Sequence, residues 1–400
     1  MVGPGPHGPA PGRRGGGRLS AVGRALVLRG GRGLGGEGLG DVLVRAGGEA
    51  AGAFLDLDGR LLLPGLVNAL DVLDLSVFPP LGAPPFPSLY AWASAVGEGD
   101  HPSVRAALRV PLVDRLFLGG LRNLLAGATA VVHHHPFHRS LARADFPVRV
   151  LARYQFADSP GRTPHLRRTY RSTDRRIPWL VRAAEGTDET ARGEVDRLAR
   201  ANVLRQNTVI LHGTGLWEGD APRIAAARAS VVWCPEADRR LYGATAPVRE
   251  LRAAGVRVGL GADSAATGSR DALSNLAAAR REGLFSDAEL LDLATRESAE
   301  VARLPLGGTE GGRPADLVVV ADVPAFLAGD RRAIDLVLVD GRPLYGAPAL
   351  VAATGAAAGE VEVDGERRLL AEPHAGRLRS LLRAHPAVSA VTWLHGVRLP

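Results

Sequence analysis

The densest group of chemically active side chains in the sequence is a run of three histidines, His133, His134 and His135. The run ends an apolar stretch with the pattern of a β-strand, and alternation along a strand places His133 and His135 on one face and His134 on the other. Imidazoles on one face are typical ligands of a divalent metal such as zinc. The alternative is that these histidines are polar residues at the rim of a sheet. We favour the alternative, because ligation needs convergent geometry that adjacent residues rarely supply.

Three other residues carry groups that could react or bind a metal. Asp74 offers a carboxylate, although an aspartate that begins a loop is common for structural reasons. Cys234 is the only cysteine, which excludes an intrachain disulfide and a Cys-rich zinc site, and a buried thiol is favoured over a nucleophile. Glu185 could act as a general acid or base, could pair with Arg182, or could begin a helix, and the sequence leaves these roles open.

The composition limits the class of protein. A chain of 400 residues with 46% hydrophobic content can bury one large core or two medium ones. The formal net charge is +7, but every cation is arginine and the arginines are scattered, so nucleic-acid binding is not predicted. No apolar run approaches the roughly 20 residues that span a bilayer. With one cysteine and no signal-type apolar segment, we expect a cytoplasmic protein that binds no membrane.

The pattern of apolar runs predicts the elements that position these residues. Between residues 61 and 302 strands alternate with helices, which indicates an α/β fold with a parallel sheet and helical crossovers. Seven strands can be assigned there and an eighth cannot. Short apolar runs at 25–28, 41–44 and 53–57, and again at 316–320 and 335–339, predict small antiparallel strands on both sides of this region.

Several segments, taken in order, resemble the metal-dependent amidohydrolases of the cytosine deaminase and chlorohydrolase branch, over roughly residues 40 to 345. The segments are Pro64-Gly-Leu-Val-Asn-Ala69, Gly127 to His133, Glu185 to Glu189, Thr208 to Gly213, Val231 to Pro235, Gly259 to Ser264 and Gly312 to Val320. The resemblance implies a (β/α)8 TIM-type barrel with a small flanking β-sandwich built from both chain ends. It also implies that residues 71–103 are the loop after the first barrel strand, on the face that carries active sites.

This resemblance sets the predicted domain organisation. We expect a disordered N-terminus at 1–18, the first part of the β-sandwich at 19–60 and the amidohydrolase-like barrel at 61–310. The second part of the sandwich is predicted at 311–346, and a C-terminal tail with a helix at 347–400.

In the family a divalent ion, zinc or iron, is held by a first-strand His-x-His pair, a second histidine-bearing strand and an aspartate. By this resemblance His212 is a metal ligand in this chain, and Asp263 is both a metal ligand and the general base. Glu185 is a further catalytic residue. The first-strand pair reads Leu70 and Val72, which have no lone pairs, and two protein ligands are fewer than the usual three at a catalytic zinc.

Two further positions depart from the family pattern, and one feature could compensate for the missing metal ligands. Arg182 stands where relatives have a histidine, and a permanent cation disfavours a nearby metal. Trp233 stands where many relatives have another histidine. Against this, His133 and His135 could complete a displaced metal site with His212 and Asp263.

The sequence therefore predicts one of two functions. The first is hydrolysis of a non-peptide C–N bond in a small substrate molecule, with cyclic molecules as candidates and zinc or iron as the cofactor. The second is a catalytically inactive, metal-free homologue that binds a small-molecule ligand or a partner subunit. The residues alone favour the second, whereas the family resemblance favours the first. Association into a homo-oligomer is left open.

Overall fold

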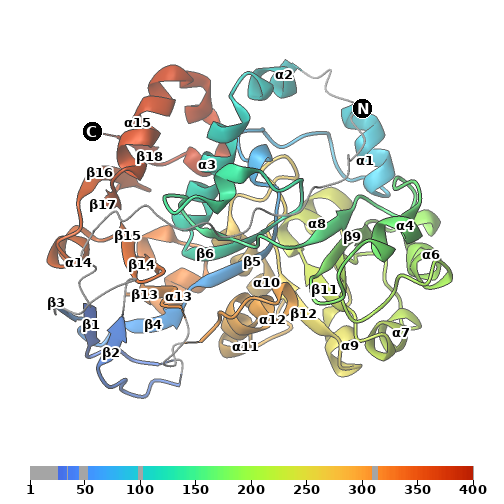
Figure 1. Ribbon diagram of the computed structural model, residues 1–400, viewed down its shortest axis with the longest axis horizontal. Helices are drawn as coiled ribbons and strands as arrows, with labels where there is room; N and C mark the ends of the chain where they lie inside the picture. Colours follow the sequence, from blue (N-terminus) through green and yellow to red (C-terminus); the bar gives the residue numbers. More distant parts are fainter. Residues whose placement is uncertain (1–25, 34, 45–52, 98–101, 309–313, 400) are drawn as a thin grey trace.

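The computed structural model describes residues 26–33, 35–44, 53–97, 102–308 and 314–399. The N-terminus predicted to be disordered, residues 1–18, lies outside these ranges. Figure 1 shows a barrel-like body of strands and helices, with the strands of the two chain ends gathered at one side of it. Among the described helices none has the length and hydropathy needed to cross a lipid bilayer.

Among the described residues, eight parallel strands form the barrel wall in two arcs. They are β5 (Leu66–Asp71), β6 (Ala128–His133), β7 (Arg149–Val150), β8 (Gln155–Ala157), β9 (Trp179–Ala183), β10 (Thr208–His212), β11 (Ser230–Trp233) and β12 (Arg257–Leu260). One arc has the order β5-β6-β7 and the other β12-β11-β10-β9-β8. A bridge between Asp71 and Asp263 joins β5 to the chain just beyond β12. The predicted TIM-type barrel is confirmed, and the strand that the sequence left unassigned is β8, which follows β7 without an intervening helix.

Helices pack on the barrel strands and, toward the C-terminal end of the chain, on the sandwich strands. They are α1 (Leu89–Val96), α2 (Pro102–Leu108), α3 (Leu112–Leu124), α4 (Leu166–Arg171), α5 (Glu189–Arg192), α6 (Glu194–Arg200), α7 (Asp220–Ala226), α8 (Pro235–Tyr242), α9 (Val248–Ala253), α10 (Ala272–Arg281), α11 (Asp287–Asp292), α12 (Ser298–Ala302), α13 (Val323–Leu327), α14 (Pro348–Ala353) and α15 (His374–Ala384). A π-helical turn, Leu293–Glu297, joins α11 to α12. Short 3-10 turns lie at Leu73–Leu75, Arg139–Ala142, Arg331–Ala333, Pro386–Ala390 and Thr392–Leu394.

Five barrel strands, β5, β6, β9, β10 and β11, are buried on both faces, which explains their mostly apolar sequences. One face packs on the helices. The other forms an interior cluster that includes Leu70, Val132, Leu180, Leu211 and Val232, one from each of five strands.

The β-sandwich is built from both chain ends, as predicted. A small sheet has the order β2-β1-β3, from β1 (Leu26–Arg29), β2 (Val42–Val44) and β3 (Ala53–Asp56). The larger sheet has the order β18-β16-β17-β15-β14-β13-β4, from β4 (Leu61–Pro64), β13 (Leu317–Val320), β14 (Ile334–Val339), β15 (Arg342–Gly346), β16 (Ala358–Val363), β17 (Glu366–Ala371) and β18 (Val397–Arg398). The two sheets share a buried cluster that includes Leu28, Leu55, Val319 and Leu338. The region predicted as a tail thus supplies three strands in addition to its helix.

A long segment after β5 crosses the carboxyl ends of the strands and is held there by backbone hydrogen bonds. We call residues 76–96 the strap. Its backbone N–H groups donate to carbonyls in two barrel loops, Leu81 to Ala266 at 2.8 Å and Leu89 to Glu185 at 3.0 Å, and to one in α8, Phe86 to Leu241 at 2.7 Å. The strap therefore covers the face of the barrel on which the polar residues described next are gathered.

Candidate functional site

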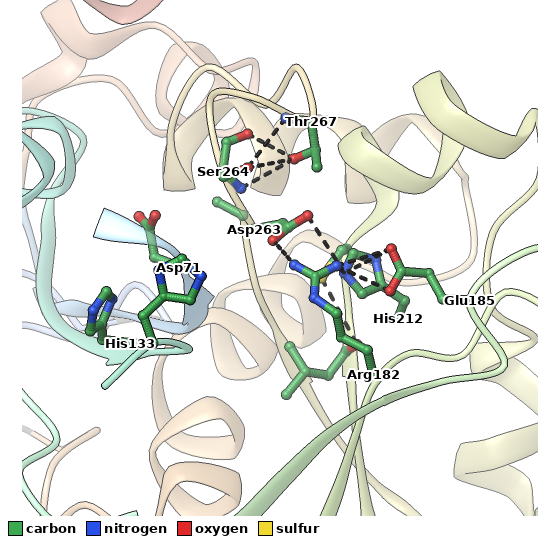
Figure 2. A network of polar contacts seen from close by, with 12 residues as sticks. Asp71, His133, Arg182, Glu185, His212, Asp263, Ser264 and Thr267 are labelled. Carbon is green, nitrogen blue, oxygen red and sulfur yellow. Dashed lines mark hydrogen bonds and ion pairs between the residues drawn. The ribbon is translucent and has the colours of Figure 1, made fainter. Parts of the chain in front are cut away.

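A single arginine side chain lies at the centre of the buried polar group in the barrel (Figure 2). Arg182, on β9, donates from Nη1 to both carboxylate oxygens of Glu185 at 3.0 Å. The same nitrogen lies 3.0 Å from Nε2 of His212, and Nη2 lies 2.5 Å from Oδ1 of Asp263. One guanidinium thus contacts all three residues that the sequence assigned to catalysis or to metal binding at this centre.

These contacts are closed off from solvent. Arg182 is 8% exposed, Glu185 1%, and His212 and Asp263 0%. Burial raises the pKa of Asp263, but the charge of Arg182 and its hydrogen bond outweigh the burial and hold that pKa below its usual value. Burial also opposes the charge of Arg182, but Asp263 and then Glu185 raise its pKa well above the ordinary range. The centre therefore holds a permanent cation and an ionised aspartate.

His212 is oriented by a second carboxylate. Its Nδ1 lies 2.7 Å from Oδ1 of Asp238, on α8, which is fully buried. Burial disfavours the imidazolium, whereas the carboxylates, Glu185 first, favour it and raise the pKa of His212. The contact with Arg182 decides the protonation state of His212 in this arrangement. If both ring nitrogens were protonated, the N–H at Nε2 would point at an N–H of Arg182, and neither group could accept. We assign the neutral ring, with its proton on Nδ1 and the Nε2 lone pair directed at Arg182.

The residues present do not fit the divalent ion that the family resemblance implies. The lone pair of His212 that would bind the ion accepts from Arg182 instead, and Asp263 is engaged by the same guanidinium. At a separation of about 4 Å and an effective dielectric constant of about 20, a divalent ion and a guanidinium repel each other by about 8 kcal/mol. Within the described ranges no three His, Cys, Asp or Glu side chains are arranged to hold a metal.

The two first-strand positions are apolar and fully integrated into the structure. Leu70 and Val72 are 0% and 2% exposed, and Leu70 belongs to the interior cluster. Their backbones pair with Asp263: its N–H donates to Leu70 at 2.9 Å, and Val72 donates to its carbonyl at 3.0 Å. The chain here is thus placed beside Asp263, and both side chains at these positions are hydrocarbon.

Trp233 and Cys234 lie on opposite faces of the wall. The indole of Trp233 packs against Phe285 in the outer core and donates to Thr245 at 2.6 Å, so it does not fill the centre. Cys234 belongs to the interior cluster, and burial raises the pKa of its thiol to about 11. It is therefore a protonated, buried thiol at neutral pH, as the sequence favoured.

The histidine run does not join His212 and Asp263. His135 lies 2.9 Å from Oδ1 of Asp74 through Nδ1, and Nε2 of His133 lies 3.9 Å from the same oxygen. Figure 2 shows His133 set apart from the Arg182 group, near Asp71. Nδ1 of His133 accepts from the backbone N–H of Leu73 at 3.3 Å, so in the neutral ring Nε2 carries the proton and has no lone pair for a metal. The contacts of His133 and His135 therefore give no support to the displaced metal site, and their role as ligands stays a prediction.

Alternation along β6 explains this separation. Val131 faces the helices and Val132 the interior, so His133 follows the outward face and His134 the inward one. His134 is 4% exposed and lies against Phe156, with ring centroids 5.1 Å apart. Burial, and then the charge of Arg182, lower its pKa well below the usual value.

Sequence reasoning missed two residues of this group, Asp238 and Tyr242. Both lie on α8, and the Tyr242 hydroxyl donates to Glu185 at 2.7 Å. Asp238 follows Pro235 by three positions. The signal that could have found it is an acidic residue one turn into a helix that begins at the end of a buried strand.

The backbone at three of these strand ends is left-handed without glycine. The φ angles are 53° at Ala184, 69° at His212 and 54° at Asp263. Such conformations cost on the order of 1–3 kcal/mol each and persist where the surroundings fix them. Strain of this kind is concentrated at ligand and catalytic sites, and here two of the three residues, His212 and Asp263, contact Arg182.

Residues 178–344 match the Amidohydrolase family. The 5-methylthioadenosine/S-adenosylhomocysteine deaminase of Halobacterium salinarum is 32% identical over 143 residues, which cover 33% of this chain and 33% of that protein. The deaminase of the same name from Pelotomaculum thermopropionicum is 33% identical over 163 residues, covering 40% and 34%. The chain thus spans about a third of the length of the curated relatives it matches.

Solved structures share the fold over nearly the whole chain. An adenosine deaminase from Xanthomonas campestris with bound zinc has a TM-score of 0.67 at 17% identity, covering 92% of this chain and 99% of that one. Atrazine chlorohydrolase from Arthrobacter aurescens, complexed with zinc, has a TM-score of 0.62 at 18% identity, covering 91% and 99%. At these identities the likeness concerns the fold.

Proposed function

We propose, given the confirmed resemblance of this chain to the amidohydrolase superfamily, that it is a metal-free homologue which binds a small molecule or a partner subunit instead of performing metal-dependent hydrolysis. The observation that carries the proposal is the position of Arg182. Its guanidinium bonds Glu185, His212 and Asp263 at once, inside a buried group.

In this proposal Arg182 takes over the structural part of a metal ion's role. A cation is needed there because buried carboxylates are stable only when paired and hydrogen-bonded. The guanidinium has five N–H donors and can satisfy several acceptors in one plane. It has no vacant orbital and cannot be deprotonated in a protein, so it neither activates a water molecule nor polarises a substrate as a Lewis acid.

The second candidate is hydrolysis of a C–N bond in a small molecule. It is favoured by the fact that Glu185, His212 and Asp263, which the family uses, remain together around one point. For this reaction the Arg182 side chain would have to leave its three partners before a metal or a substrate could reach them.

Elemental analysis of the purified protein distinguishes the two candidates. The protein is produced with zinc, iron and manganese in the medium and dialysed under mild conditions, alongside R182A, H212A and a surface control, R200Q. We expect far less than one equivalent of metal in the unmodified protein, in H212A and in R200Q. Metal uptake by R182A alone would show that the guanidinium excludes the ion.

Near-stoichiometric metal in the unmodified protein, lost in H212A and kept in R200Q, would overturn the proposal. It would favour the hydrolase, and deaminase and amidohydrolase substrates would then be screened with that metal-loaded protein.

A further inference from the structure

A hollow on the carboxyl face of the barrel lies beside the sealed centre but outside it. It has a volume of about 300 Å³ and is lined by Thr187, Arg192, Thr214, Gly215, Leu216 and Trp217. Thr187 follows Glu185 by two residues, and Thr214 follows His212 by two. The hollow is therefore formed by the loops after β9 and β10, the strands that carry Arg182 and His212.

Its aromatic wall is exposed and held in place. The Trp217 side chain is 58% exposed, whereas Trp179, Trp233 and Trp393 are buried. The Trp217 ring lies against Gly219, where an added Cβ would come within 3.0 Å of it. The backbone N–H of Trp217 also reaches a carboxylate oxygen of Asp220 at 3.4 Å. An exposed indole offers a large apolar ring face on which an aromatic ligand can stack.

The polar groups of the hollow are a free cation and hydroxyls. Arg192, at the end of α5, is exposed and forms no ion pair with any described residue. Thr214 is 7% exposed, and its hydroxyl has no hydrogen-bond partner among the described groups. A buried hydroxyl without a partner is uncommon and points to a missing water or ligand.

We propose that this hollow binds a small planar aromatic anion, whose ring stacks on Trp217 and whose negative group pairs with Arg192 and accepts from a threonine hydroxyl. The size fits one or two fused rings, since ligand pockets begin at about 300 Å³. A carboxylate and a phosphate both suit a guanidinium fork, so the recognised chemistry is an aromatic ring with an attached oxyanion. The site does not depend on whether Arg182 excludes a metal.

Fluorescence titration of the whole protein tests this site, because Trp217 is the most exposed of the five tryptophans. The probes are benzoate and phenyl phosphate. Two control compounds resemble benzoate: benzamide, which is uncharged, and cyclohexanecarboxylate, which is not aromatic. We expect saturable quenching by benzoate or phenyl phosphate, and the stronger of the two identifies the preferred oxyanion. Benzamide and cyclohexanecarboxylate should bind at least about tenfold more weakly, since each lacks one of the two contacts.

Three variants locate the binding. R192Q and T214V should each weaken the preferred probe, R192Q by about tenfold or more, because a charge-assisted hydrogen bond is lost. Saturation-transfer NMR of the probe should show no binding by W217A. The matched control is R200Q, an exposed arginine on the neighbouring helix α6, which should bind as the unmodified protein does. Equal binding of benzamide, unchanged binding by R192Q, or no saturable quenching by either anion would each overturn the proposal.

Discussion

The Nη2 atom of Arg182 lies 2.5 Å from Oδ1 of Asp263, although the two residues are 81 positions apart in the chain. The contact joins β9 to the chain segment beyond β12, across the interior of the barrel. It means that the aspartate which the family resemblance assigns to a metal and to proton transfer is held by an internal cation. The stability of the barrel and the chemistry of its centre therefore depend on the same side chain.

Replacing Arg182 should strongly destabilise the protein. R182M keeps a long side chain but leaves Glu185 and Asp263 buried without their cation, and breaking a buried pair in this way costs about 3–5 kcal/mol. The free energy of unfolding from urea titration gives the cost. The surface control R200Q should stay within about 0.5 kcal/mol of the unmodified protein.

A double variant separates the ion pair from the packing of the side chain. Asp263→Asn removes one of the uncompensated charges, so R182M/D263N should be more stable than the sum of the two single changes predicts, with a coupling of about 1–3 kcal/mol. Additive costs would mean that Arg182 acts through packing and that the ion pair contributes little.

Leu70 should behave as a core residue, although the resemblance aligns it with a metal-binding histidine. It is 0% exposed within the interior cluster. We therefore expect L70A to lower the free energy of unfolding by about 2–5 kcal/mol, and L70M, which keeps the volume, to cost less than about 1.5 kcal/mol. Thermal and urea unfolding of both variants measure this. A tolerated L70A would mean that the position is loosely packed and open to a ligand.

The fold was predictable because it depends on patterns that are local in sequence. Each barrel strand is a short apolar run with its own turn signals, and the resemblance fixed the order of these runs. The exception, β8 at Gln155–Ala157, is a three-residue strand with one aromatic and two partly buried residues, too short to show a period. The strands β16 to β18 were missed because their alternation is weak and partly charged.

The site was only partly predictable, because its contacts join distant residues. The sequence allowed Arg182 to pair with Glu185, which is three positions away, and it does. It could not show that the same side chain reaches His212 and Asp263, at separations of 30 and 81 residues. Alternation along β6 shows that His133 and His134 point to opposite faces, but it does not show which of the two faces is the barrel interior.

The hydrogen bond between His212 and Asp238 should stabilise the protein mainly because Asp238 supplies an acceptor oxygen, and less because Asp238 is charged. D238A removes the acceptor of the Nδ1 proton and leaves a buried donor unpaired, which costs about 1–3 kcal/mol. D238N keeps an oxygen that can accept, so it should cost clearly less than D238A. Urea unfolding of the pair decides this. Equal costs in D238A and D238N would mean that the carboxylate charge, and so the imidazolium form of His212, is what stabilises the protein.

Glu194 should make stability depend on pH in a direction unusual for a carboxylate. Its Oε1 accepts from the hydroxyl of Tyr90 in the strap, and its Oε2 accepts from the backbone N–H of Ala184 at 2.8 Å. Burial raises its pKa to about 7, although both hydrogen bonds oppose the shift. The folded protein therefore keeps this proton at pH values where the unfolded chain has lost it.

The sign follows from that difference in proton binding. A raised folded-state pKa stabilises the protein fully below the unfolded value of about 4.5, and the contribution is lost as pH rises through about 7. The difference between a pKa of 4.5 in the unfolded chain and about 7 in the fold corresponds to about 3 kcal/mol. In E194Q this part of the pH dependence should disappear, because the amide still accepts from Ala184 but cannot ionise. Urea unfolding between about pH 4.5 and 8 measures it, with E300Q, an exposed carboxylate paired with Arg296, as the control. A slope that is the same in E194Q and in the unmodified protein would mean that Glu194 is already ionised in the fold and that the strap is held by its other contacts.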